Sequence, residues 1–176
     1  MSNKLFFAAA AALVAAVASP AFAQSSASTT GTGSVTIVRP LTITKNADLA
    51  FGTVVRPATG SGTAVVSAAG ARSVTGGVVG LSSGATPAAA QFTVSGEGGQ
   101  SISVTIPATF SMANGPDTLT VTTSNNLTGS ASAQTLSNAM GAAGTLVFNV
   151  GGSVPIASTT PTGTYSGSFT VSAAYN

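Results

Sequence analysis

Apolar and polar side chains alternate along much of the chain from residue 34 onward. The longest such stretch is residues 164–176, in which one set of positions holds mainly serine and threonine. The other set consists of Tyr165, Gly167, Phe169, Val171, Ala173 and Tyr175. A period of two is typical of a β-strand with one buried face. We therefore predict a long strand that continues to the C-terminus.

Shorter segments with strand character precede it and are separated by turns rich in glycine, asparagine and proline. They are residues 34–43, 49–55, 63–69, 73–81, 91–95, 101–106, 118–122 and 145–150. With the C-terminal segment they give about eight or nine strands. Because helices do not alternate with these strands, we predict an all-β protein, an antiparallel immunoglobulin-like β-sandwich.

Two turn sequences suggest which strands are neighbours. Residues 96–99 form a short glycine-rich connection, which favours an antiparallel hairpin between the strands on either side. The sequence Asn114-Gly115-Pro116-Asp117 is a second hairpin signal. Residues 131–143 are rich in alanine but interrupted by polar residues and glycine, so we predict a loop with one helical turn there.

The N-terminus predicts the compartment. Lys4, an apolar stretch over residues 5–18 and the sequence Ala21-Phe22-Ala23 together have the form of a secretory signal peptide, residues 1–23. We therefore expect an exported protein, in the periplasm, at the cell surface or outside the cell, with no transmembrane segment after cleavage. Residues 24–33 have low complexity and predict a flexible leader, followed by a single domain over residues 34–176.

Charged residues are scarce. After residue 23 the chain has the basic residues Arg39, Lys45, Arg56 and Arg72 and only three acidic ones. This near-neutral balance argues against a nucleic-acid or anionic-membrane partner. Cysteine is absent, so stability has to come from burial and backbone hydrogen bonds rather than from disulfides.

The composition also argues against an enzyme. The chain has no histidine or cysteine, so its serines have no obvious activating base. The acidic residues Asp48, Glu97 and Asp117 are scattered along the chain, and we interpret them as turn or surface residues. We expect Asp48 to form a weak ion pair with Lys45. We therefore predict no catalytic residue, no cofactor and no metal site. The phenylalanines and tyrosines fall mostly at core-facing positions.

Two longer runs resemble a known family. They are Leu41-Thr-Ile-Thr-Lys-Asn-Ala-Asp-Leu-Ala-Phe-Gly-Thr-Val54 and Gly163-Thr-Tyr-Ser-Gly-Ser-Phe-Thr-Val-Ser-Ala-Ala-Tyr-Asn176. With the glycine-rich middle they resemble the bacterial secreted proteins of domain-of-unknown-function family 4402. They also look like archaic chaperone-usher pilins and spore coat U domains. The resemblance implies an exported subunit of a pilus-like surface fibre, with other copies and a periplasmic chaperone as partners.

A pilin of this kind lacks one strand of its sandwich, and the N-terminal segment of the next subunit completes the sheet. On that interpretation the groove lies beside the C-terminal strand, with Tyr165, Phe169, Val171 and Tyr175 as its candidate residues. The donor candidates in the N-terminal segment are Val35 and Ile37.

Two alternatives remain open from the sequence. In the first, the sandwich is complete by itself and the same residues belong to an ordinary core. In the second, the protein is a monomeric binding or adhesion module that uses the loops over residues 57–62 or 151–163 to hold a glycan or a protein.

Overall fold

The computed structural model describes residues 25–129, 131 and 133–176, so the predicted signal peptide lies outside the described residues. Within these residues every regular element is a strand and every strand pairing is antiparallel. The strands are β1 (Thr42–Ala47), β2 (Val54–Val55), β3 (Ser61–Val66), β4 (Arg72–Thr75), β5 (Val79–Gly80), β6 (Ala90–Glu97), β7 (Ser101–Thr105), β8 (Thr109–Asn114), β9 (Asp117–Asn125), β10 (Gln134–Thr135), β11 (Ala143–Ala157) and β12 (Ser172–Tyr175). No helix among the described residues is long and apolar enough to cross a bilayer.

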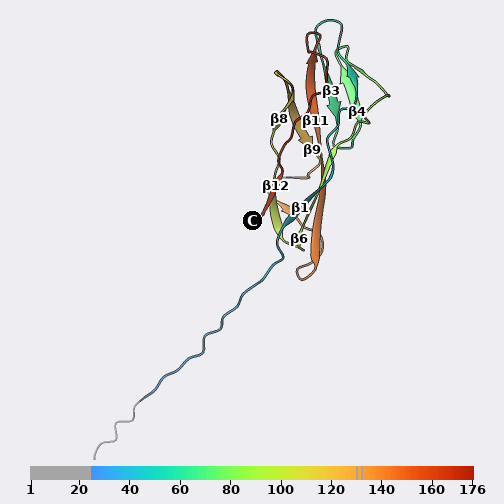
Figure 1. The fold of residues 1–176 in the computed structure, drawn as a ribbon. Coiled ribbons are helices and arrows are strands. Elements are labelled where there is room, and N and C mark those ends of the chain that lie inside the picture. The colour runs from blue at the N-terminus through green and yellow to red at the C-terminus, as the bar shows by residue number, and fades with distance from the viewer. Residues whose placement is uncertain (1–24, 130, 132) are drawn as a thin grey trace, which may run out of the picture. The chain divides into compact units, whose positions relative to one another are not determined.

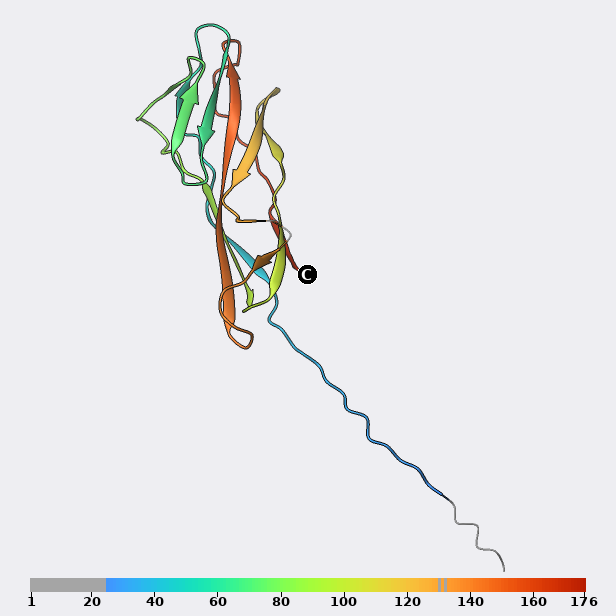
Figure 2. The same cartoon turned by 180° about the vertical axis from the view of Figure 1, so that it is seen from behind.

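The long strand β11 organises the larger sheet (Figure 1). It pairs with β6 through its first half, with β3 through its second half and with β9 across its middle. Gly152 and Ser153 pair with β3 and β9 at the same time, so these two strands lie on opposite edges of β11. The strands β1, β4 and β8 then pair with β6, β3 and β9, which gives seven strands in all. Figure 2 shows the same domain from behind.

A second, smaller sheet has β7 at its centre. Ile102 pairs with Gln134 of β10 and with Tyr175 of β12, so these two strands lie on opposite edges of β7. Buried side chains of β7 pack with those of β6 and β11 in one hydrophobic cluster. Its fully enclosed members include Phe148, Ile102, Leu136, Val94 and Val150. The predicted all-β antiparallel sandwich is therefore confirmed, with twelve strands in the described residues rather than eight or nine.

A second hydrophobic cluster lies under the other half of β11. It contains Ala64, Val78, Val121, Val154 and Ile156. The clusters draw on opposite halves of the same strand, since Val150 belongs to the first and Val154 to the second. Leu49 packs against both.

The hairpin predicted at residues 96–99 is wrong. β6 and β7 lie in different sheets, and the connection between them crosses from one layer to the other. Its backbone is bonded elsewhere, because the N–H of Gly98 donates to Ala142 and that of Gly99 donates to Leu136. The second hairpin is confirmed: Asn114 pairs with Asp117, and Gly115 has a φ of 61°, which a tight two-residue turn requires.

The predicted strand over residues 34–43 does not form as expected. Residues 25–41 have no strand, and β1 begins only at Thr42. The N–H of Arg39 donates to the carboxylate of Glu97 rather than to a strand partner, and Pro40 has no N–H to donate. These two residues end the ladder before it can reach Ile37.

Two further predictions need correction. The described residues of 131–143 contain no helical turn, and they include the short strand β10. The predicted strand over 164–176 is regular only at Ser172–Tyr175, with one isolated bridge between Ser166 and Ala113. The segment first lies against β8 and then joins β7, so it cannot pair continuously with either strand.

We expect Phe148→Ala to lower the free energy of unfolding by about 3–5 kcal/mol, because it removes a ring that is 1% exposed and stacked on Phe92 at 5.6 Å. Denaturant titration measures the loss. The control is Val147→Ala, at the neighbouring position of β11, where the side chain is 54% exposed. Equal losses in the two variants would contradict the packing described here.

Candidate functional site

The chain between β11 and β12 lies along β8 without joining a continuous ladder (Figure 1). Ser166 exchanges both backbone hydrogen bonds with Ala113, at 2.8 and 3.0 Å. Alternate residues of an extended chain direct their N–H and C=O groups to opposite sides, so those of Tyr165 and Gly167 face away from β8. Among the described residues, none of the backbone hydrogen bonds outside the strand ladders involves residues 167–171 as donor or acceptor. This segment therefore presents an unpaired backbone edge.

The chain between β1 and β2 lies across from this edge and is held in place by Arg72. The guanidinium of Arg72 donates to the carbonyls of Phe51 at 3.2 Å, Thr53 at 3.0 Å and Leu81 at 2.7 Å. A Cβ at Gly52 or Gly80 would lie 2.7 or 2.5 Å from guanidinium nitrogens of Arg72, so a side chain at either position would displace the guanidinium. Residues 51–53 are thereby fixed before anything binds beside them.

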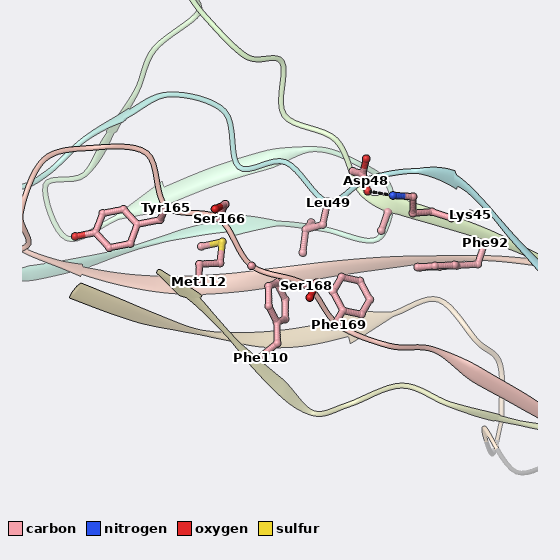
Figure 3. Close-up of a pocket in the computed structure, with 12 residues that line it drawn as sticks. Lys45, Asp48, Leu49, Phe92, Phe110, Met112, Tyr165, Ser166, Ser168 and Phe169 are labelled. Carbon is pink, nitrogen blue, oxygen red and sulfur yellow. Dashed lines mark hydrogen bonds and ion pairs between the residues drawn. The ribbon is translucent and has the colours of Figure 1, made fainter. Parts of the chain in front are cut away.

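Between these two segments lies a hollow of 310 Å³ with apolar side chains in it (Figure 3). Leu49 comes from one side, Phe169 from the other, and Phe110 and Met112 from β8. The rings of Phe110 and Phe169 are 4.9 Å apart, and those of Phe92 and Phe169 are 6.0 Å apart. We call this the aromatic hollow.

Lys45 and Asp48 also line the aromatic hollow, and their side chains form an ion pair of 2.6 Å (Figure 3). The pair is the one expected from the sequence. Both side chains are more than half exposed, so the interaction contributes little to stability.

Two more hollows continue from the aromatic one. A central hollow of 460 Å³ shares Leu49, Met112 and Tyr165 with it. An end hollow of 360 Å³ shares Val54, Leu119, Ile156, Gly163 and Tyr165 with the central one. The aromatic and end hollows have only Tyr165 in common, so the three lie in a row. We call this row the groove.

The four groove candidates from the sequence fall into two pairs. Tyr165 lines all three hollows, and Phe169 lines the aromatic hollow. Val171 and Tyr175 line none of them and instead pack against the cluster between the two sheets. Phe169 also packs against that cluster, so the first half of the C-terminal segment lines the groove and the second half packs only against the core.

The donor candidates Val35 and Ile37 are 84% and 86% exposed. Neither belongs to a strand. Their role as donors stays a prediction.

Sequence reasoning missed the residues that form the base of the groove. Phe110 and Met112 are two residues apart on β8, and Leu119 on β9 is two residues from Val121, which lies fully buried in the core beneath. That alternation, on the two sides of a hairpin signal, was the available evidence that these residues share one face. It could not indicate that the face is only partly covered.

The loop predicted at residues 151–163 is shorter than expected, because residues 151–157 belong to β11. What remains of it lies beside the connection between β2 and β3, since Arg56 donates to the carbonyl of Thr160 at 2.6 Å. Thr160 and Pro161 line the end hollow. In the described part of the chain, no group of three or more acidic, histidine or cysteine residues could hold a metal ion.

Glu97, predicted to be a surface residue, is buried at the point where the domain begins. Its carboxylate accepts from the side chain of Arg39 at 2.9 Å and from the N–H groups of Arg39 and Gly141. Its own N–H donates to the hydroxyl of Tyr175, which in turn donates to the carbonyl of Arg39. The hydrogen bond from Gly141, with further help from Arg39, lowers the pKa of Glu97. The cluster fixes both backbone groups of Arg39.

A family profile described as a domain of unknown function (DUF4402) matches residues 41–175. The match covers most of the chain, and the chain belongs to this family. Comparison with curated proteins gave no match, and neither did comparison with solved structures.

We expect the stability that Glu97 provides to be lost in acid. The pKa of this carboxyl is lower in the folded than in the unfolded protein, so its charge stabilises the fold at any pH above the unfolded-state pKa. The stabilisation disappears as the pH falls through the folded-state pKa. Glu97→Gln should therefore lower the melting temperature at pH 7, and the difference from the wild type should shrink at pH 3.

Asp117→Asn is the control, because it removes a carboxylate at the tip of the β8–β9 hairpin instead. A difference between wild type and Glu97→Gln that stays constant from pH 7 to pH 3 would show that the charge of Glu97 does not contribute.

Proposed function

We propose that this DUF4402 protein is a non-enzymatic structural subunit, exported and assembled into a cell-surface fibre by donor-strand complementation. In this proposal the leader is extended to include Val35 and Ile37, and residues 25–37 of one copy add a strand to the groove of the next copy. The observation that carries the proposal is the apolar groove beside the unpaired backbone edge at Tyr165 and Gly167.

The groove has what an added strand needs. Its backbone edge can exchange main-chain hydrogen bonds with an extended peptide, and its apolar base can receive every second side chain of that peptide. Met112 and Leu119 lie in the base and belong to strands that are already paired. A strand laid over them would complete the layer without rearranging β8 or β9.

The leader suits this groove in composition. Residues 25–38 are exposed, form no strand and contain no charged side chain, so their entry into an apolar groove would desolvate no charge. Val35 and Ile37 would lie on one face of an extended leader, with Gly31 and Gly33 preceding them on that face. Threonine, valine and isoleucine favour strands.

Side-chain burial alone would not hold the leader. Burying Val35 and Ile37 contributes about 1.5–3 kcal/mol each. Ordering the backbone of about seven residues, the length of the groove edge at residues 163–169, costs about 1–2 kcal/mol per residue. The remainder has to come from main-chain hydrogen bonds, at about 0.5–1.5 kcal/mol each. For binding of the leader, the main-chain hydrogen bonds at the free edge therefore contribute more than side-chain burial in any single hollow.

Export and an assembly partner belong to the same proposal. Residues 1–23 supply the sequence argument for export. A subunit with an open groove is prone to nonspecific pairing, so we propose that a periplasmic chaperone occupies the groove before assembly.

The proposal is tested with protein that starts at residue 24, by light scattering and by negative-stain microscopy of the high-mass fraction. We expect polymers, and we expect deletion of residues 25–37 to leave a monomer that binds a synthetic peptide of residues 28–38. In the full chain, Ile37→Asp should abolish polymers because it places a charge on the buried face of the donor.

Thr36→Asp is the matched control, since it introduces the same charge one residue away, on the face that an inserted strand turns to solvent. A full-length chain that remains a monodisperse monomer, together with no binding of the peptide, would overturn the proposal. That result would favour the alternative of a monomeric binding module, with the loop at Arg56 and Thr160 as its binding surface.

A further inference from the structure

Exposed apolar side chains gather at two places on the domain, outside the core and the base of the groove. One is the leader-side patch, Val38 and Met140, which are 38% and 59% exposed and share a shallow hollow that Ile37 and the Arg39–Glu97 ion pair also line. The other is the groove-end patch, Val55, Val79 and Leu81. Val55 and Val79 are directly paired across β2 and β5 and are 46% and 54% exposed.

The leader-side patch lies where the donor segment leaves its own domain. Arg39 is held through both its N–H and its carbonyl, by Glu97 and by Tyr175. Only Val38 separates this fixed residue from Ile37, so Ile37 cannot lie more than about 7 Å along the chain from Arg39. A copy whose Ile37 occupies a neighbour's groove therefore brings its leader-side patch to the end of that groove.

The two ends of the groove differ in what a neighbouring domain would cover. At one end lie Lys45 and Asp48, a solvent-exposed ion pair whose burial carries a desolvation cost. At the other end Val55 lines the end hollow and joins the exposed groove-end patch, and Arg56, the charged residue that also lines this hollow, donates to the carbonyl of Thr160. Covering apolar surface is favourable. The neighbour's domain is therefore best accommodated at the Val55 end.

We propose that the leader-side patch of one copy docks on the groove-end patch of the next, as a second contact between subunits in addition to the donor strand. The inference rests on the proposed function, because the donor strand brings the two patches together. The occupant of the groove-end patch is accordingly a second copy of this chain. This contact would fix the angle between successive subunits. The donor strand alone, joined to its domain by one linking residue, would restrict that angle less.

The experiment changes one patch at a time and keeps donor and groove intact. We expect Val79→Asp to raise the protein concentration needed for polymers by roughly tenfold or more, and Met140→Asp to do the same. Val147→Asp is the matched control, because Val147 is 54% exposed like Val79 but lies on β11 outside both patches. Met140→Lys combined with Val79→Asp should restore assembly relative to either single variant, because the new charges attract across the contact.

A second measurement separates this inference from the proposed function. The domain without residues 25–37 is titrated with the peptide of residues 28–38, with and without Val79→Asp. Equal affinities, together with impaired polymers in the full chain, support the patch contact. Full-length Val79→Asp and Met140→Asp chains that polymerise as well as Val147→Asp would overturn the contact while the donor strand stands. Failure of the unsubstituted domain to bind the peptide would overturn both.

Discussion

The hydrogen-bond ladder of β11 is the interaction on which the rest of the domain depends. One strand of fifteen residues supplies backbone partners to β6, β3 and β9, and its side chains enter both hydrophobic clusters. At Gly152 both edges are occupied, and added Cβ atoms there and at Gly151 would meet neighbouring atoms. The two small residues therefore let three strands approach the same short stretch of backbone. The positions of the two sheets, the two hydrophobic clusters and the groove all depend on β11.

The alternation of apolar and polar residues predicted which faces are buried. Phe92 and Val94 on β6, and Ile102 and Val104 on β7, lie in the core as their spacing indicates. Alternation carries no information about which strand is the neighbour. The glycines at residues 96–99 look the same in a tight hairpin and in a crossing between layers, and only the bonds of Gly98 and Gly99 to the segment before β11 distinguish the two.

Long-range contacts account for the other differences between prediction and structure. The burial of Glu97 depends on Arg39 and Gly141, which are 58 and 44 residues away along the chain. The C-terminal segment has the alternation of a single strand, yet its halves meet different partners, first Ala113 and then β7. Tyr165 and Phe169 were predictable as inward-facing residues, but the gap beside them depends on the separate placement of residues 49–55.

Arg72 links the groove to positions that do not line it. Its guanidinium occupies the space that side chains at Gly52 and Gly80 would need, while its hydrogen bonds hold the chain opposite the free edge. Gly52 also has a φ of 72°, so glycine is favoured there for a second reason, whereas Gly80 has no such constraint. A side chain at residue 80 would therefore push the guanidinium of Arg72 away from the carbonyls that it holds. A substitution on the short strand β5, which lines none of the three hollows, would thus loosen the chain on the far side of the groove.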